Sequence, residues 1–84
     1  MTTLDQALKS KKVVFGVERT MKLLKKDNLK VIFLANNTKE ELKEDFQYYA
    51  KIGNVEVVEL DMKNKEVGTY CKKPFSVSVV GLEK

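Results

Sequence analysis

The chain has 84 residues, of which 43% are hydrophobic and 33% are charged, and its formal net charge is +4. This length predicts a single domain, residues 1–84, and this composition excludes an intrinsically disordered chain. With no histidine and one cysteine, Cys71, the sequence excludes an intrachain disulfide and a Cys/His zinc site. Residues 1–10 lack the apolar core of a signal peptide, and no apolar run is long enough to span a membrane. We therefore expect a cytoplasmic protein, because a lone thiol suits a reducing compartment.

The first half of the chain predicts two helices, each followed by a strand. Residues 3–6, Thr-Leu-Asp-Gln, fit a capping box and predict a short helix that ends near Lys11. The apolar run 13–15 predicts a brief strand, and residues 17–27 predict a second helix from the spacing of their apolar side chains. Residues 31–35 are apolar without interruption, which is typical of a strand buried on both faces of a sheet.

The predicted second helix has one apolar and one basic face. Its apolar stripe consists of Val17, Met21 and Leu24. Its basic stripe consists of Arg19, Lys22 and Lys26. Basic residues also surround it in sequence, since eight residues from Lys9 to Lys30 are Lys or Arg and only Glu18 and Asp27 are acidic. The positive charge therefore belongs to the first half of the chain and favours an anionic partner.

The third predicted helix opens at a second capping box, residues 38–41, Thr-Lys-Glu-Glu, and Gly53 ends it. Its predicted buried face consists of Leu42, Phe46, Tyr49 and Ala50. Tyr48 lies off this face, and we expect it to be an ordinary exposed aromatic residue.

The last third of the chain predicts a strand at 55–60, a polar loop at 61–65 and a short helix around 67–71. Pro74 blocks the continuation of that helix. Residues 75–80 alternate Phe and Val with Ser and predict the final strand. The resulting order, helix then strand repeated four times, predicts an α/β fold in which helices lie on both sides of a sheet.

Five short motifs resemble the kink-turn RNA-binding superfamily. The stretch 12–22, Lys-Val-Val-Phe-Gly-Val-Glu-Arg-Thr-Met-Lys, resembles the opening of that superfamily. Four more, in register, resemble its archaeal and eukaryotic large-subunit ribosomal branch, the "thirty-e" type: Ala35-Asn36-Asn37, Tyr48-Tyr49-Ala50, Glu66-Val67-Gly68-Thr69 and Pro74-Phe75-Ser76-Val77-Ser78. The resemblance implies a three-layer α/β/α sandwich with a four-stranded mixed sheet. It also implies a non-enzymatic protein without a cofactor that clamps a kinked internal loop of ribosomal RNA.

The same resemblance implies three neighbouring RNA contacts. They are the turn and start of the second helix, the asparagine before the third helix, and the loop before the fourth. The residues implied are Gly16, Glu18, Arg19, Thr20, Lys22, Lys26, Asn37, Leu60, Met62 and Lys63. Four positions depart from the family pattern: Glu18 replaces Lys, Arg or Asn, Lys72 replaces glycine, Leu60 stands where a relative carries an aromatic residue, and Val67 replaces a common Leu. Glu18 matters most, because an acid near phosphate repels it.

The candidate residues also have structural interpretations. Gly16 permits a tight turn, or opens a helix N-terminus whose N–H groups bind phosphate. The basic stripe is either a solvated face or a phosphate contact, and Glu18 can pair with Lys22. If Thr38 caps the third helix, Asn37 is free for a base edge; otherwise it is a turn residue. Leu60 is either the buried end of a strand or a surface for a splayed base.

The sequence thus predicts a structural constituent of the large ribosomal subunit, monomeric when free, with ribosomal RNA and neighbouring ribosomal proteins as partners. The nearest alternative is a non-ribosomal kink-turn binder, in a guide-RNA particle or as a regulator. An enzyme is disfavoured because the chain has no C-x-x-C, G-x-G-x-x-G or P-loop motif. A protein-interaction module of the same superfamily is disfavoured because, by resemblance, the members with that function are strongly acidic, whereas this chain is basic.

Overall fold

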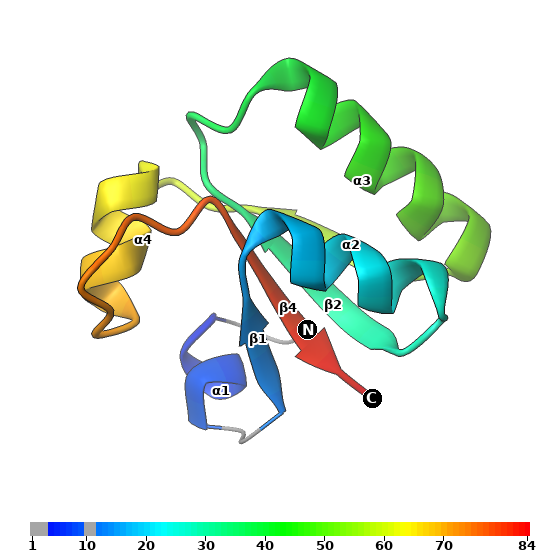
Figure 1. Cartoon of the computed structure of the whole chain (residues 1–84), viewed down its shortest axis with the longest axis horizontal. Helices are drawn as coiled ribbons and strands as arrows, with labels where there is room; N and C mark the ends of the chain where they lie inside the picture. The colour runs from blue at the N-terminus through cyan, green and yellow to red at the C-terminus, as the bar shows by residue number, and fades with distance from the viewer. Residues whose placement is uncertain (1–3, 10–11) are drawn as a thin grey trace.

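The computed structural model describes residues 4–9 and 12–84, in which helices and strands alternate as predicted (Figure 1). The elements are α1 (Leu4–Lys9), β1 (Val13–Phe15), α2 (Val17–Lys25), β2 (Leu29–Leu34), α3 (Glu40–Gly53), β3 (Glu56–Glu59), α4 (Asn64–Tyr70) and β4 (Val79–Glu83). The cap predicted at Thr3 and the helix end predicted near Lys11 lie outside the described residues. No helix among the described residues is long and apolar enough to cross a membrane.

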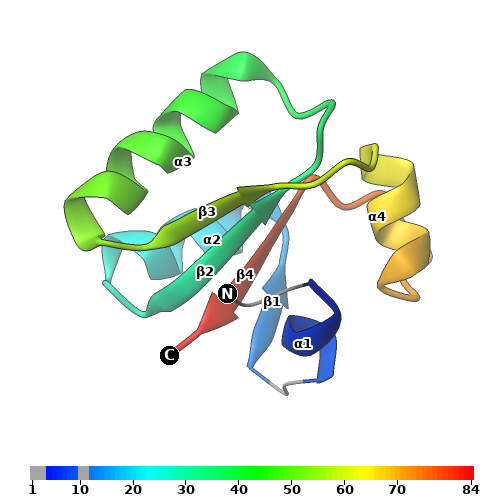
Figure 2. The same ribbon diagram turned by 180° about the vertical axis from the view of Figure 1, so that it is seen from behind.

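The four strands form one mixed sheet in the order β1-β4-β2-β3 (Figure 2). β4 is antiparallel to both β1 and β2, and β2 is parallel to β3. β1, β2 and β3 therefore all run in one direction, and all three end where β4 begins. The predicted four-stranded mixed sheet is confirmed.

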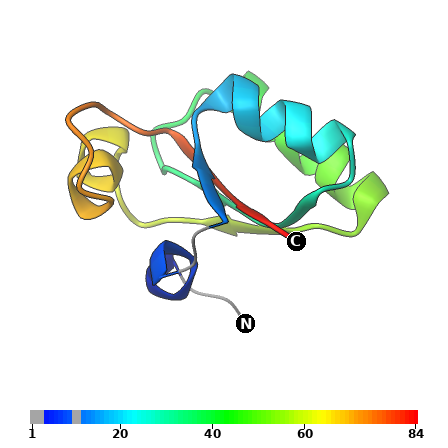
Figure 3. The ribbon, with the colours of Figure 1, turned by 60° about the horizontal axis from the view of Figure 1, so that its bottom comes forward.

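The helices cover both faces of the sheet, which confirms the three-layer arrangement. α2 and α3 lie on one face and α1 lies on the other, with α4 at one end of the sheet (Figure 3). Successive residues of β2 serve opposite cores: Ile32 packs with Phe46 of α3, whereas Phe33 packs with Ala7 of α1 and Val67 of α4. This alternation explains why the central strands are apolar at consecutive positions.

Residues with positive φ follow α2 and α3 and terminate both helices. α2 ends at Lys25, two residues before the predicted end, and Asp27 takes the left-handed conformation with φ of 59°. The N–H groups of Asp27 and Asn28 donate to Leu24 O and Leu23 O at 3.1 and 3.0 Å, which is the Schellman pattern. α3 ends at Gly53, the residue predicted to stop it, but the left-handed residue is Asn54, with φ of 56°.

The capping box predicted at Thr38 is wrong. The Thr38 hydroxyl donates to the carbonyl oxygen of Ser78 at 3.3 Å, so it serves the segment before β4. α3 begins two residues later, at Glu40, with Lys39 as N-cap and no side-chain cap. Thr38 is buried, which fits this role in joining two segments of the fold.

The last strand was predicted four residues too early. β4 spans Val79–Glu83, and residues 75–78 form a loop instead. The N–H of Val77 donates to Asn64 O at 3.0 Å, so this segment binds α4 instead of continuing the sheet. Gly68 permits the approach, because a Cβ there would collide with the carbonyl oxygen of Phe75. Phe75, predicted to alternate into the core, is exposed.

Candidate functional site

Four segments meet at the end of the sheet where β1, β2 and β3 finish. The N–H of Gly16 donates to Val79 O at 3.1 Å, and the N–H of Ala35 donates to Ser78 O at 2.9 Å. The N–H of Asn36 donates to Met62 O at 2.9 Å. We call this region the loop end. It comprises the turn at Gly16 with the first turns of α2, and residues 35–39, 60–64 and 74–78. The loop from β2 to α3 and the loops before and after α4 lie together at this end of the sheet (Figure 2).

Gly16 leaves the start of α2 open. Its φ of 108° lies in a region that side chains disfavour, and nothing lies within 4 Å of where its Cβ would be. No side chain caps α2, so the N–H groups of its first turn have no side-chain partner. Such a helix N-terminus combines free donors with the positive end of the helix dipole, which suits an anion or a base edge.

The basic stripe of α2 is exposed as predicted, with Arg19, Lys22 and Lys26 all on the surface. Thr20 differs from its neighbours. Its side chain is fully buried against Gly81 of β4, and its hydroxyl has no hydrogen-bond partner. Thr20 therefore packs the helix on the sheet and presents no side-chain group to a partner.

Glu18 lines a groove between α2 and α3. It does not form the predicted ion pair with Lys22; the ion pair that the described residues show joins Lys84 to Asp27 at 3.2 Å. The groove measures about 490 Å³ and is lined by Val17, Glu18, Met21, Lys22, Lys25, Leu42, Asp45 and Tyr49. Glu18 of α2 and Asp45 of α3 thus place two carboxylates in the groove, next to the basic residues of α2.

Asn37 is held by Asn64, the first residue of α4. Its Oδ1 accepts the Asn64 N–H at 2.9 Å, and its Nδ2 donates to Asn64 Oδ1 at 3.2 Å. Asn37 therefore caps α4 from the loop before α3, because Lys63, the N-cap residue, supplies no side-chain cap. Its amide keeps one N–H and one oxygen lone pair for another partner. The expectation that Asn37 is free of structural duties is wrong.

The remaining predicted residues of the loop end are partly accessible. Leu60 and Met62 are half-buried and pack against the core under α1 and α4, whereas Lys63 is exposed. Met62 also lines a shallow hollow of about 390 Å³ with Lys65, Glu66, Thr69 and Tyr70 of α4. The predicted loop ends earlier than expected, since Lys65 already belongs to α4.

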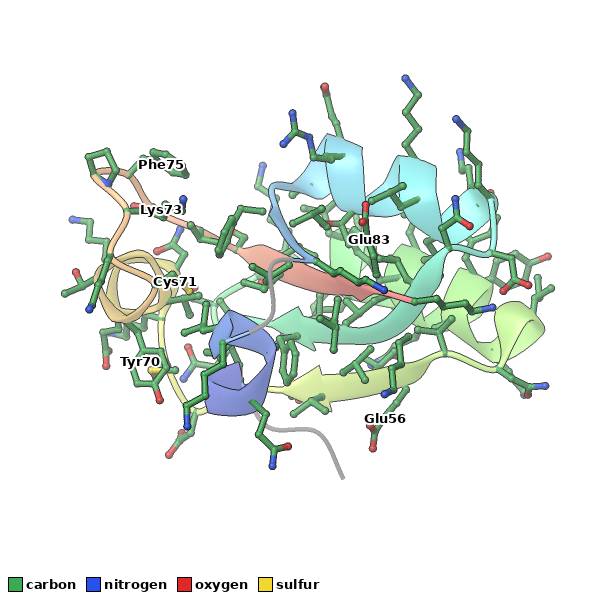
Figure 4. All side chains as sticks on the ribbon, turned by 90° about the horizontal axis from the view of Figure 1, so that it is seen from below. Glu56, Tyr70, Cys71, Lys73, Phe75 and Glu83 are labelled. Carbon is green, nitrogen blue, oxygen red and sulfur yellow. The ribbon has the colours of Figure 1, made fainter. Side chains whose placement is uncertain are left out.

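Sequence reasoning missed two residues of this region, Asn64 and Phe75. Phe75 is 57% exposed and lines a hollow of about 280 Å³ with Lys65, Thr69, Lys73, Pro74 and Ser76. It projects from the loop between α4 and β4 (Figure 4). The signal was present in Lys72-Lys73-Pro74, a polar run typical of a loop, but the Phe/Val alternation was given more weight.

The segment after α4 also explains why the family pattern has a glycine where this chain has Lys72. Lys72 adopts φ of 60°, which is the conformation that a glycine takes most readily. The next residue, Lys73, places its Nζ 4.7 Å from the ring centroid of Phe15.

Burial raises the pKa of the Cys71 thiol, and the nearby Lys73 charge opposes this only in part. Cys71 is therefore a protonated core residue rather than a nucleophile.

Comparison with known proteins identifies relatives across the whole chain. The model of the "Ribosomal protein L7Ae/L30e/S12e/Gadd45 family" matches residues 1–84. Large ribosomal subunit protein eL30 of Sulfurisphaera tokodaii is 38% identical over 79 residues, which are 94% of this chain and 74% of the relative. The eL30 proteins of Methanocaldococcus jannaschii and Branchiostoma belcheri are 38% and 35% identical, over 88% and 94% of this chain and 67% and 69% of theirs.

The fold also matches a solved structure of low sequence similarity. A protein of unknown function from Bacillus halodurans superposes with a TM-score of 0.81 at 14% identity, over 93% of this chain and 77% of that one. This likeness supports the architecture alone.

Proposed function

Because the chain belongs to the ribosomal protein L7Ae/L30e/S12e/Gadd45 family, we propose that it is a structural constituent of the large ribosomal subunit that binds ribosomal RNA through its loop end. The eL30 relatives, named for the large subunit, support the subunit assignment. The RNA element that it binds is a kinked internal loop. Before assembly, the protein is a monomer in the cytoplasm. Neighbouring ribosomal proteins complete its surroundings.

One observation carries the proposal: an uncapped helix N-terminus, exposed cations and an exposed aromatic ring lie at one end of the sheet. The N–H groups at the start of α2 suit a phosphate or a base edge. Arg19 and Lys22, one helical turn apart on the exposed side of α2, suit phosphates. Phe75 offers a ring on which an unstacked base can lie. This combination fits an irregular RNA better than a regular duplex, whose bases are stacked inside.

The other residues of the loop end have narrower roles in this proposal. Asn37 uses its remaining N–H for a base edge while it holds Asn64. Leu60 and Met62 pack against a splayed base, and Lys63 contacts phosphate. Lys26, at the far end of α2, reaches the phosphate backbone of the RNA helix that flanks the kink. Thr20 supports the interface from the core and makes no side-chain contact.

Co-sedimentation with large subunits depleted of this protein tests the subunit assignment. We expect the chain to load with one copy per subunit and to resist a wash at moderate salt. Lys22→Ala should load less well than Lys30→Ala, a matched control that removes an exposed lysine near the start of β2, at the opposite end of the sheet. Failure to load, together with tight binding to a kinked RNA of another particle, would support the non-ribosomal alternative instead.

A further inference from the structure

Four large apolar side chains are exposed in the part of the chain that the structure describes. Tyr70 ends α4 and Phe75 lies in the loop after it, and the two line different hollows. Tyr48 and Ile52 are 63% and 66% exposed and lie on α3. They are four residues apart and therefore project as a pair from the same side of the helix. This pair is about 12–18 Å along α3 from its start at the loop end.

Tyr48 is held in place although it is exposed. Its ring meets the Tyr49 ring edge to face, with centroids 5.2 Å apart and an angle of 77° between the planes. Lys25 of α2 in turn places its Nζ 5.3 Å from the Tyr49 ring centroid. Tyr48 therefore loses little side-chain freedom when a partner covers it, which is the property of an effective aromatic anchor.

The charges around this pair identify the chemistry of the partner. Glu41, Glu44 and Asp45 are exposed on the same side of α3, one or two turns before Tyr48 and Ile52, and they outnumber Lys51, the exposed base next to Ile52. Asp45 and Tyr49 also line the groove between α2 and α3, so the apolar surface continues into a depression. Carboxylates repel phosphate, so their presence beside Tyr48 and Ile52 disfavours RNA as the partner of this side of α3. Tyrosine and isoleucine with charges at the rim resemble the anchors of a protein interface.

We propose that this side of α3, which we call the α3 docking surface (Glu41, Glu44, Asp45, Tyr48 and Ile52), binds a basic segment of another protein. Apolar side chains of that segment cover Tyr48 and Ile52 and enter the groove, and its lysines or arginines face the carboxylates. The proposal rests on the proposed function in one respect: the partner is a protein neighbour in the same particle. The chain would then contact RNA at the loop end and protein along α3.

Site-specific photo-crosslinking in purified, reloaded large subunits tests the proposal. A photoreactive phenylalanine derivative is placed at position 48 in one preparation and at position 75 in another. We expect position 75 to crosslink to RNA and position 48 to crosslink to a protein whose attached peptide is basic. RNA attached at position 48, or no adduct there in loaded subunits, would overturn the proposal. If position 75 does not crosslink to RNA, this counts against the proposed function, and the crosslink at position 48 still tests the protein partner of α3.

A charge-reversing substitution gives an independent test, because it should change subunit loading in opposite directions for a basic protein partner and for an RNA partner. Glu44→Lys should weaken loading on subunits if a basic protein faces α3, and should strengthen it if RNA does. Glu56→Lys on β3 makes the same change in charge away from α3 and is the control. Tyr48→Ser combined with Ile52→Ser should weaken loading about tenfold or more, as expected for buried anchors, without changing affinity for isolated kinked RNA. Equal loading of the double variant and the wild type would overturn the proposal.

Discussion

Replacing Asn37 with alanine tests the structural and functional roles of this residue at once. The change removes two hydrogen bonds to Asn64, of 2.9 and 3.2 Å, and leaves the first N–H of α4 without its cap. Loss of a helix cap costs about 1 kcal/mol, and the second bond, which is exposed, adds roughly 0.5 kcal/mol. A total near 1.5 kcal/mol corresponds to a fall in Tm of roughly 6–12 °C for a domain of this size.

The matched variants are Asn36→Ala and Asn37→Asp. Asn36 is the exposed neighbour of Asn37, and among the bonds shown for the described residues it uses only its main chain. Asn36→Ala should therefore change stability by less than about 0.5 kcal/mol. Asn37→Asp keeps an acceptor for the Asn64 N–H and places a negative charge at the start of α4, so the fold should remain stable. It removes the amide donor, so affinity for kinked RNA should fall.

Urea unfolding and RNA titration of the three variants separate these roles. Asn37→Ala should lose both stability and about 1–3 kcal/mol of binding to kinked RNA, the range of a good base contact. Asn37→Asp should lose only the binding. If Asn37→Ala unfolds at the same urea concentration as Asn36→Ala, the cap contributes nothing to stability and the structural role of Asn37 is excluded.

Three further substitutions follow from the same geometry. Glu18→Lys should tighten binding to most RNAs in titrations at fixed salt and leave the urea midpoint nearly unchanged, since Glu18 forms no ion pair with Lys22 among the described residues; weaker RNA binding would mean that Glu18 contacts a base. Lys22→Ala should weaken binding to all RNAs by a similar factor and reduce the log–log salt slope by roughly one unit, whereas Lys51→Ala should leave the slope unchanged. Lys72→Gly should raise the free energy of unfolding by about 0.5–1 kcal/mol, because it relieves a positive φ; a destabilised protein in urea titration would show that the Lys72 side chain contributes more than this strain costs.

The sequence predicted the order of the elements and the mixed sheet because apolar patterning reflects burial directly. The continuous run at 31–35 is typical of a strand between two layers, and Ile32 and Phe33 do face opposite cores. Element ends were less predictable, since they depend on backbone conformations such as the positive φ of Asp27 and Asn54. Thr20 could have been recognised as buried from its spacing, three residues after Val17 and four before Leu24.

The errors at the candidate site have a common cause, which is contact between segments distant in sequence. Thr38 fits a local capping motif, but the Ser78 carbonyl, forty residues later, takes its hydroxyl. Asn37 was expected to be free because Thr38 was taken as the helix cap, and its partner Asn64 is the first residue of a helix distant in sequence. Phe75 was assigned to a strand because alternation cannot distinguish a strand from an extended loop that binds a helix. Local motifs describe what a side chain is able to do, and tertiary contacts decide which of these it does.

In the proposed function, the loop end recognises a kink in RNA. The decisive measurement is the affinity of the protein for an RNA with a kinked internal loop and for a plain duplex of equal length, both at the same salt concentration. Binding should be tighter to the kinked RNA, with a preference that Phe75→Ala and Asn37→Asp reduce and Lys51→Ala does not. Equal affinity for the two RNAs would rule out recognition of the kink, because only a basic surface without recognition of shape would then remain.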